Sequence, residues 1–222
     1  MGHAGTGLCA NVHVAGLFPR ADPGGLPDRG FLHQPHHSAD DETPWHGTFV
    51  GGLALYGDIE ARVRQGQFLP DLRLFSGKVF NDDGNDQIEF VEKAVEAAVR
   101  DLHDQYGCRV FNFSYGDLNK IYDGRHVRGF AYTLDRLTRE LGVLFVVPTG
   151  NLHPSELPDN SQDVYPEYLF SESSRLLDPA PALNVLTVGG LATHEASRDA
   201  QRYPNSCEDH PLARTGQPFP LT

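Results

Sequence analysis

Apolar residues recur at helical spacing in two segments of the chain. Over residues 88–102 they stand three and four positions apart, which predicts an amphipathic helix. Residues 128–141 repeat this pattern, and Gly142 suits the left-handed residue that ends a helix. Residues 46–58 are apolar or small on all sides, which predicts a buried helix. The chain therefore contains at least three helical segments that must pack against something else.

Short apolar runs separate these helices and predict strands. The predicted strands are 11–18, 73–80, 110–114, 143–147 and 183–188, and the fourth looks buried on both faces. Strands that alternate with helices are typical of an α/β fold, so we expect a three-layer fold with a mostly parallel central sheet and helices on both faces. In such a sheet, functional groups collect at the carboxyl ends of the strands.

Composition divides the chain into two parts. Residues 1–42 mix Pro, Gly, Asp and His without a regular period, which predicts an irregular or disordered N-terminal segment ahead of an α/β domain over 43–222. Hydrophobic residues make up 39% of the 222, enough for a core. The net charge of −12 argues against nucleic acid and against anionic membranes as partners, because both require a basic surface.

The cysteines support neither a zinc site nor a disulfide framework, because they are odd in number, far apart and contain no CxxC pair. They are Cys9, Cys108 and Cys207. Cys108 precedes an apolar strand and is expected to be a small core residue. Neither a signal peptide nor an apolar run of the ~20 residues that a membrane span needs is seen, so a cytoplasmic location is expected.

Two polar residues stand where chemistry is expected. His46 opens the buried helix, and a histidine with a near-neutral pKa can take up and return a proton. Asn151 follows the strand 143–147, where its amide can donate a hydrogen bond to a developing oxyanion. Each residue has a purely structural alternative: a capping or loop histidine, and an asparagine in a turn.

The strand 110–114 ends in a polar exit. Ser114, Tyr115 and Gly116 lie there and form a candidate edge for an extended peptide, which would bind by strand addition. The alternative is an ordinary strand and its turn. Ser114 lacks the glycine-flanked setting at a helix start that exposes a nucleophilic hydroxyl, so it is not assigned that role.

Four motifs occur in one order: HGTFVGG at 46–52, VFNFSYGD at 110–117, VVPTGN at 146–151 and LNVLTVGG at 183–190. Together they resemble the subtilisin-like (S8) serine peptidases, in a divergent bacterial form, over residues 44–192. The resemblance implies a subtilisin-like fold and a serine-type endopeptidase acting on extended peptides or proteins. It also implies His46 as the general base and Asn151 in the oxyanion hole.

The chain departs from the family at the other two catalytic motifs. The family aspartate motif, D-[ST]-G, would fall near residues 14–18, where no Asp occurs; Asp22 and Asp28 are weak candidates that lie too close to His46. The serine motif, G-T-S-x-[AS]-x-P, is absent. The triad then lacks its nucleophile, and the isolated chain is predicted to be inactive.

Three interpretations stay open at this point. The chain is an endopeptidase fragment that a complementing chain with the serine segment would complete, a non-catalytic peptide-binding pseudo-peptidase, or a truncated gene product. No cofactor is predicted. Asp82, Asp83 and Asp86 present oxygen ligands for calcium, but their spacing does not fit an EF-hand and a solvated turn is the better interpretation. The histidines at 33, 36 and 37 are likewise interpreted as a solvated polar stretch rather than a zinc site.

Overall fold

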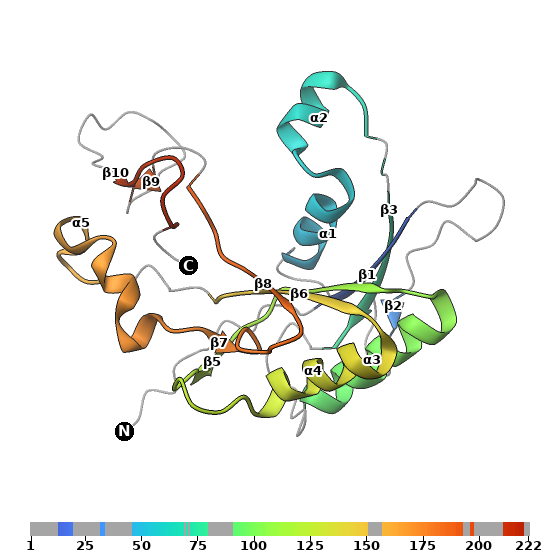
Figure 1. The fold of residues 1–222 in the computed structure, drawn as a ribbon. Coiled ribbons are helices and arrows are strands. Elements are labelled where there is room, and N and C mark those ends of the chain that lie inside the picture. The colour runs from blue at the N-terminus through green and yellow to red at the C-terminus, as the bar shows by residue number, and fades with distance from the viewer. Residues whose placement is uncertain are drawn as a thin grey trace, which may run out of the picture.

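The computed structural model describes residues 13–19, 32–33, 46–68, 70, 72–79, 91–150, 157–192, 196–197 and 211–219. Its main element is a six-stranded sheet in the order β2-β3-β1-β4-β6-β8 (Figure 1). The strands are β1 (His13–Pro19), β2 (Leu32–His33), β3 (Leu72–Lys78), β4 (Val110–Phe113), β6 (Leu144–Pro148) and β8 (Leu186–Val188). The strands that were predicted at 11–18, 73–80, 110–114 and 143–147 are all present, with ends shifted by a few residues, and the strand predicted at 183–188 is the shorter β8.

The sheet is mostly parallel, as predicted. β2 pairs parallel with β3, β4 with β6, and β6 with β8. β1 is the exception, since it pairs antiparallel with both of its neighbours, β3 and β4. Because β3 and β4 both oppose β1, they run in the same direction, and β1 alone is reversed.

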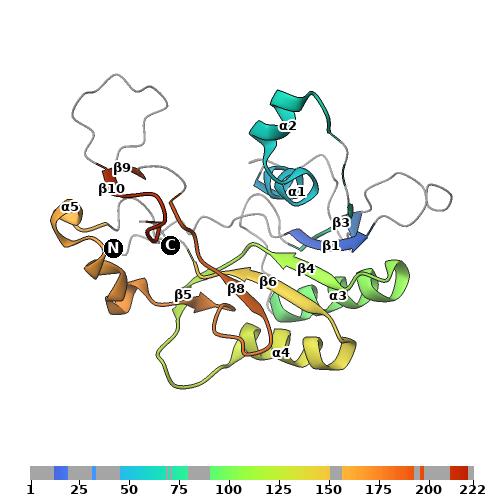
Figure 2. The same ribbon diagram turned by 45° about the horizontal axis from the view of Figure 1, so that its top comes forward.

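Helices cover both faces of this sheet and confirm the three-layer fold. They are α1 (His46–Tyr56), α2 (Ile59–Gln65), α3 (Val91–Tyr106) and α4 (Gly129–Leu141), whereas the short α5 (Ser161–Val164) lies away from the sheet (Figure 1). α3 and α4 lie side by side on one face, whereas α1 and α2 lie on the other, with α2 further from the sheet (Figures 1 and 2). None of the helices in the described residues is both long and apolar enough to cross a membrane.

Local signals explain where these helices begin and end. α2 was not predicted, but Asp58 caps it by accepting a hydrogen bond from the Ala61 N–H at 2.9 Å, and Gly66 closes it with φ of 64°. Gly142 ends α4 in the predicted way, with φ of 64° and its N–H bonded to the Thr138 carbonyl. These caps satisfy backbone groups that the helix itself leaves unpaired.

The core lies between the sheet and the α3–α4 layer. Phe111 of β4 stacks on Phe145 of β6 with ring centroids 5.5 Å apart, and Phe113 meets Phe130 of α4 edge-on at 4.7 Å. Cys108 is fully buried in this core, as predicted, and burial raises the pKa of its thiol to about 11. Aromatic pairs on adjacent strands and the facing helix therefore fix how α4 sits on the sheet.

The opposite face of the sheet is partly uncovered. Leu144 of β6 is 40% exposed although Phe145 beside it is fully buried, so the expectation that this strand is buried on both faces was wrong. Val146 pairs with Leu186 of β8, which is 51% exposed. Among the described strands, α1 packs mainly on β3. Apolar side chains consequently remain open to solvent over β6 and β8.

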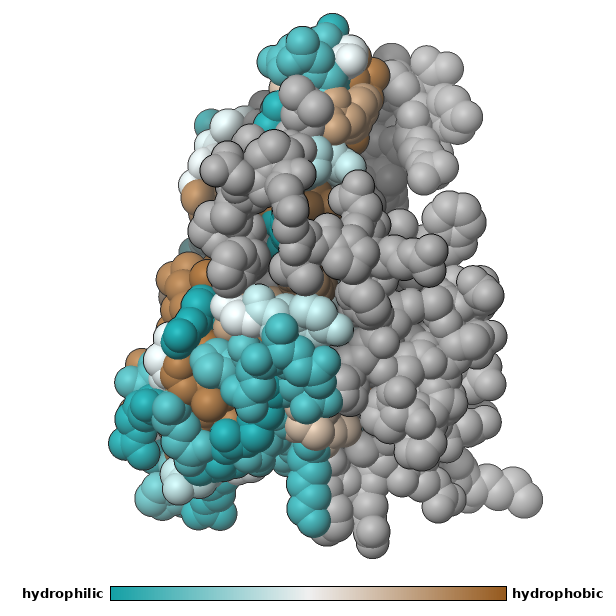
Figure 3. Space-filling view, turned by 90° about the vertical axis from the view of Figure 1, so that its right-hand side faces the viewer, coloured by the Kyte–Doolittle hydropathy of each residue, from teal (hydrophilic) through white to brown (hydrophobic). Residues whose placement is uncertain are grey.

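Hydrophilic residues gather over α2 and over the part of the molecule formed by α3 and α4 (Figure 3). Part of this surface is an ion network between the two helices. Arg136 donates to Glu96 at 2.6 Å, and Arg100 donates to Glu140 at 2.5 Å. The network ties α3 to α4 at their solvent side, where salt bridges contribute little individually.

Two small ribbons were not predicted. β5 (Asp117–Ile121) pairs antiparallel with β7 (Leu177–Asp178), and β9 (Ala196–Ser197) pairs antiparallel with β10 (Pro211–Ala213). Two 3₁₀ helices, η2 (Glu167–Phe170) and η3 (Glu172–Ser174), precede β7. β5 begins directly after Ser114–Gly116, the predicted substrate edge that follows β4.

Candidate functional site

The carboxyl ends of β4 and β6 lie side by side because the two strands are parallel neighbours, with Asn112 opposite Val146. β4 leads into Ser114, whose hydroxyl accepts a hydrogen bond from the Asn112 amide at 2.8 Å. β6 leads into Thr149, whose N–H donates to the Val188 carbonyl at 3.1 Å. The structure thus brings two of the sequence motifs together at one edge of the sheet.

The predicted substrate edge is well ordered by packing. Tyr115 is half-buried and its ring lies 5.6 Å from Phe113 and 6.2 Å from Phe130. Its N–H donates to the Phe113 carbonyl at 3.0 Å. The Tyr115 ring therefore belongs to the edge of the core, and the contact of an extended peptide with Ser114–Gly116 stays a prediction.

A leucine fills the space between the two strand ends. A Cβ placed on Gly150 would lie 2.7 Å from Leu177 Cγ, and one placed on Gly116 would lie 3.1 Å from Leu177 Cδ1. Gly150 also has φ of 130°, which side-chain-bearing residues rarely adopt. Leu177 is held there because its N–H donates to the Thr149 carbonyl at 3.0 Å. One side chain from β7 thus strongly favours glycine at 150 and leaves only tight space for a larger residue at 116.

Two buried carboxylates hold the segment around Leu177 against α4. Asp178 accepts hydrogen bonds from the N–H groups of Phe130 and Ala131 at 3.3 and 2.9 Å. It thereby caps α4, because Arg128 at the N-cap position of this helix makes no side-chain hydrogen bond of its own. Burial raises the pKa of Asp178, although these two hydrogen bonds lower it. Asp135 makes the opposite connection, because it lies on α4 itself and accepts hydrogen bonds from the backbone N–H groups at 183 and 184. Sequence reasoning missed both residues because their partners lie 47 to 49 positions away.

His46 is the first residue of α1, as predicted, but its side chain lies outside the described residues, as does all of Asn151. Their approach to one another therefore stays a prediction. α1 packs closely on β3 at Gly51, where an added Cβ would lie 2.9 Å from Leu74 Cδ2. Gly52 has no neighbour within 4 Å of such a Cβ, and Leu53 is 41% exposed, so the expectation of a buried helix here was wrong.

The remaining candidates also fall on residues that the structure does not describe. These are Asp22, Asp28, Asp82, Asp83 and Asp86, together with the side chains of the histidines at 33, 36 and 37. In the part of the chain that is described, no group of three or more His, Cys, Asp or Glu side chains is arranged to hold a metal ion.

Comparison with known proteins supports the motif pattern. An uncharacterized protein, y4bN, from Sinorhizobium fredii (strain NBRC 101917 / NGR234) is 38% identical over 127 residues, which are 56% of this chain and 29% of that protein. No solved structure matches the chain significantly. The description of the peptidase S8 family, the subtilases, matches residues 28–214, and this span contains all four motifs and the strand ends that meet beside Leu177. The chain belongs to the subtilase family.

Proposed function

We propose that this chain is the histidine- and oxyanion-bearing part of a serine-type endopeptidase. The observation that carries the proposal is the meeting of the β4 and β6 ends, which brings the segment Ser114–Gly116 and the segment leading into Asn151 to one edge of the sheet beside Leu177. In this proposal an extended peptide pairs with Ser114–Gly116 by strand addition. The peptide bond to be cut would then lie near the segment that leads into Asn151.

Each proposed catalytic group has one task. His46 takes the proton from a serine hydroxyl as that oxygen attacks the peptide carbonyl, and later returns it to the leaving amine. Asn151 donates a hydrogen bond to the oxyanion of the tetrahedral intermediate, which stabilises the transition state by about 3–4 kcal/mol, a magnitude known from a subtilisin rather than derived from this structure. Neither task can start without a nucleophile.

The serine is proposed to come from a segment outside these 222 residues, for example on a complementing chain, since they contain no G-T-S-x-[AS]-x-P motif. The uncovered face over β6 and β8 supports this idea. Leu186 and Val188 are 51% and 46% exposed on a strand that adjoins the proposed site. A helix with an apolar side would bury them, and burial of each square ångström of apolar surface contributes about 25 cal/mol.

The first test uses the chain alone. A fluorophosphonate probe should not label it and a quenched peptide library should not be cut, whereas labelled extended peptides should bind with measurable fluorescence anisotropy. Stoichiometric labelling at a serine would overturn the assignment of the nucleophile to a segment outside these 222 residues. Failure of every peptide to bind would overturn the proposed substrate edge.

The second test adds the missing part. If a G-T-S-x-[AS]-x-P segment is encoded beside this chain, co-expression of the two should restore labelling and cleavage. In that complex, Asn151→Ala should lower kcat roughly 10²–10³-fold, and His46→Ala should lower it roughly 10⁴-fold or more. The exposed, non-site substitution Asp104→Ala is the matched control and should leave kcat unchanged.

A non-catalytic peptide-binding module is the alternative, and the absent serine motif favours it. The two functions differ in their dependence on His46. A binder should retain its peptide affinity in His46→Ala and Asn151→Ala and should stay inactive in every co-expression. An endopeptidase should lose turnover in both variants.

A further inference from the structure

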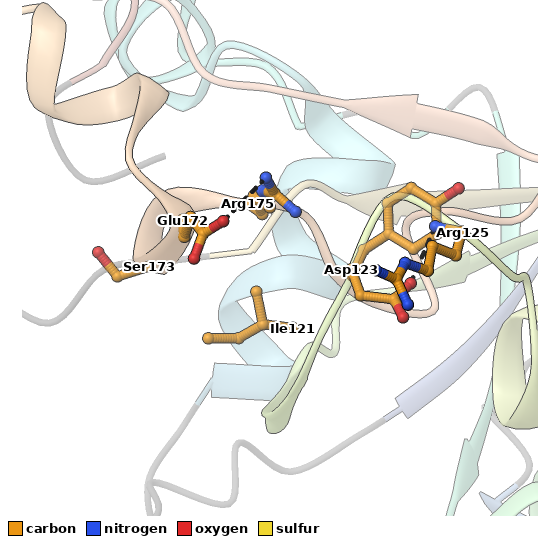
Figure 4. Close-up of a pocket in the computed structure, with 7 residues that line it drawn as sticks. Ile121, Asp123, Arg125, Glu172, Ser173 and Arg175 are labelled. Carbon is orange, nitrogen blue, oxygen red and sulfur yellow. Dashed lines mark hydrogen bonds and ion pairs between the residues drawn. The ribbon is translucent and has the colours of Figure 1, made fainter.

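A recess of about 560 Å³ lies beside the β5–β7 ribbon, outside the strand ends described above (Figure 4). One wall is the turn after β5, with Tyr122, Asp123 and Arg125. The other wall comes from η3 and the residue after it, with Glu172 and Arg175. Figure 4 shows Arg175 beside Glu172, between it and the turn that carries Arg125. Arg175 Nη1 would lie 3.9 Å from a Cβ placed on Gly124 of that turn.

The two acidic residues of this recess only partly neutralise its two arginines. The carboxylate of Asp123 faces its own turn and accepts a hydrogen bond from the Arg125 backbone N–H at 2.9 Å. This backbone bond is the main reason that the pKa of Asp123 is lowered. Glu172 meets Arg175 at only 3.4 Å, and its side chain is 92% exposed. Within the described residues, the Arg125 guanidinium has neither a hydrogen bond nor an ion pair, so donors are left over for a ligand.

The recess is coupled to the proposed substrate edge by the backbone of β7. Tyr122 N–H donates to the Leu176 carbonyl at 2.9 Å, and Leu177 N–H donates to the Thr149 carbonyl at 3.0 Å. Arg175 precedes Leu177 by two residues, a step of about 7 Å along an extended strand. Alternate side chains of a bound extended peptide are spaced by the same distance. Leu177 already fills the space between the strand ends. A side chain of the bound peptide that is excluded from this space could therefore reach the recess instead.

We propose that this recess is a subsite for an acidic side chain of the bound peptide, whose carboxylate is held by Arg125 and Arg175. The inference rests on the proposed function, since it requires a peptide along Ser114–Gly116. Guanidinium groups are suited to it because their planar N–H donors match the two oxygens of a carboxylate. Tyr122 and Ile121 would contact the methylene groups of a glutamate.

The test compares fluorescent peptides that differ only in a glutamate or a glutamine, scanned across an otherwise constant extended sequence. At one position the glutamate peptide should bind about threefold to tenfold more tightly, because partly exposed ion pairs have modest strength. Arg175→Gln and Arg125→Gln should each reduce this preference, and high salt should reduce it as well. Glu172→Gln should increase it, since the competing carboxylate is removed.

Arg64→Gln on α2 is the matched control, because Arg64 is also an exposed arginine in an ion pair with a glutamate. It should leave the preference unchanged. Equal binding of both peptides at every position would overturn the acidic subsite while leaving the proposed function intact. A preference that persists in both Arg175→Gln and Arg125→Gln would overturn it too. Loss of all peptide binding in the wild type would overturn both proposals.

Discussion

Asp135 makes contacts whose loss should strongly lower the stability of the domain. Its carboxylate is 9% exposed and accepts three hydrogen bonds: from the Leu183 N–H at 3.1 Å, the Asn184 N–H at 2.6 Å and the Asn184 side-chain amide at 3.1 Å. Hydrogen bonds to a charged group contribute about 1.5–3 kcal/mol each. Because Leu183 and Asn184 are exposed, water can replace part of what is lost. We therefore expect Asp135→Ala to lower the free energy of unfolding by about 2–4 kcal/mol.

Urea unfolding followed by circular dichroism measures this change as a shift in the midpoint at constant slope. Asp104→Ala is the control, because Asp104 is 70% exposed and, among the residues that the structure describes, pairs only with His103 beside it; it should stay within about 0.5 kcal/mol of the wild type. Asp135→Asn should fall between the two, since one oxygen still accepts a hydrogen bond. A free energy of unfolding for Asp135→Ala equal to that of the control would refute the reasoning.

Three further predictions use the same protein. Gly150→Ala should lower the free energy of unfolding by about 2–5 kcal/mol, through both a clash at 2.7 Å and a φ of 130°, whereas Gly189→Ala, with 3.6 Å of clearance, should change it little in the same urea experiment. The hydrogen bond from Arg136 lowers the pKa of Glu96 below its ordinary 4.5, so the stability that this pair contributes is present above that pH and is lost as the pH falls; Glu96→Gln should flatten the acid side of the stability profile. Cys108, whose thiol pKa is raised to about 11, should resist iodoacetamide at pH 8 until urea is added, as judged by mass spectrometry of its peptide.

The periodic elements could be predicted from the sequence because their burial pattern is local. The helix at 128–141 has buried residues on one side throughout, such as Leu134 and Leu137, and the capping glycine at its end is visible in the sequence. The direction of β1 could not be predicted in this way. Alternation of side chains is the same for a strand in either direction, so the residues of β1 do not reveal that it opposes β3 and β4.

The candidate site was only partly predictable for a related reason. Gly116 and the segment leading to Asn151 were found because they belong to short motifs next to strands. Leu177 carries no motif, although its contacts favour glycine at 150 and leave little space at 116. Its role arises from a contact between β7 and two distant strand ends, and no property of the residues around it in the sequence signals that contact.

These contacts make the geometry of the strand ends depend on α4. Asp178 follows Leu177 directly and is bonded to the first turn of α4, while Asp135 of the same helix holds the chain at 183 and 184, just before β8. A shift of α4 would therefore move Leu177 relative to Gly116 and Gly150. Aromatic contacts also hold α4 on β4, so the position of Leu177 at the two glycines depends on how α4 sits on the sheet. A peptide bound at Ser114–Gly116 should consequently lose affinity in Asp135→Ala even though Asp135 would not touch it.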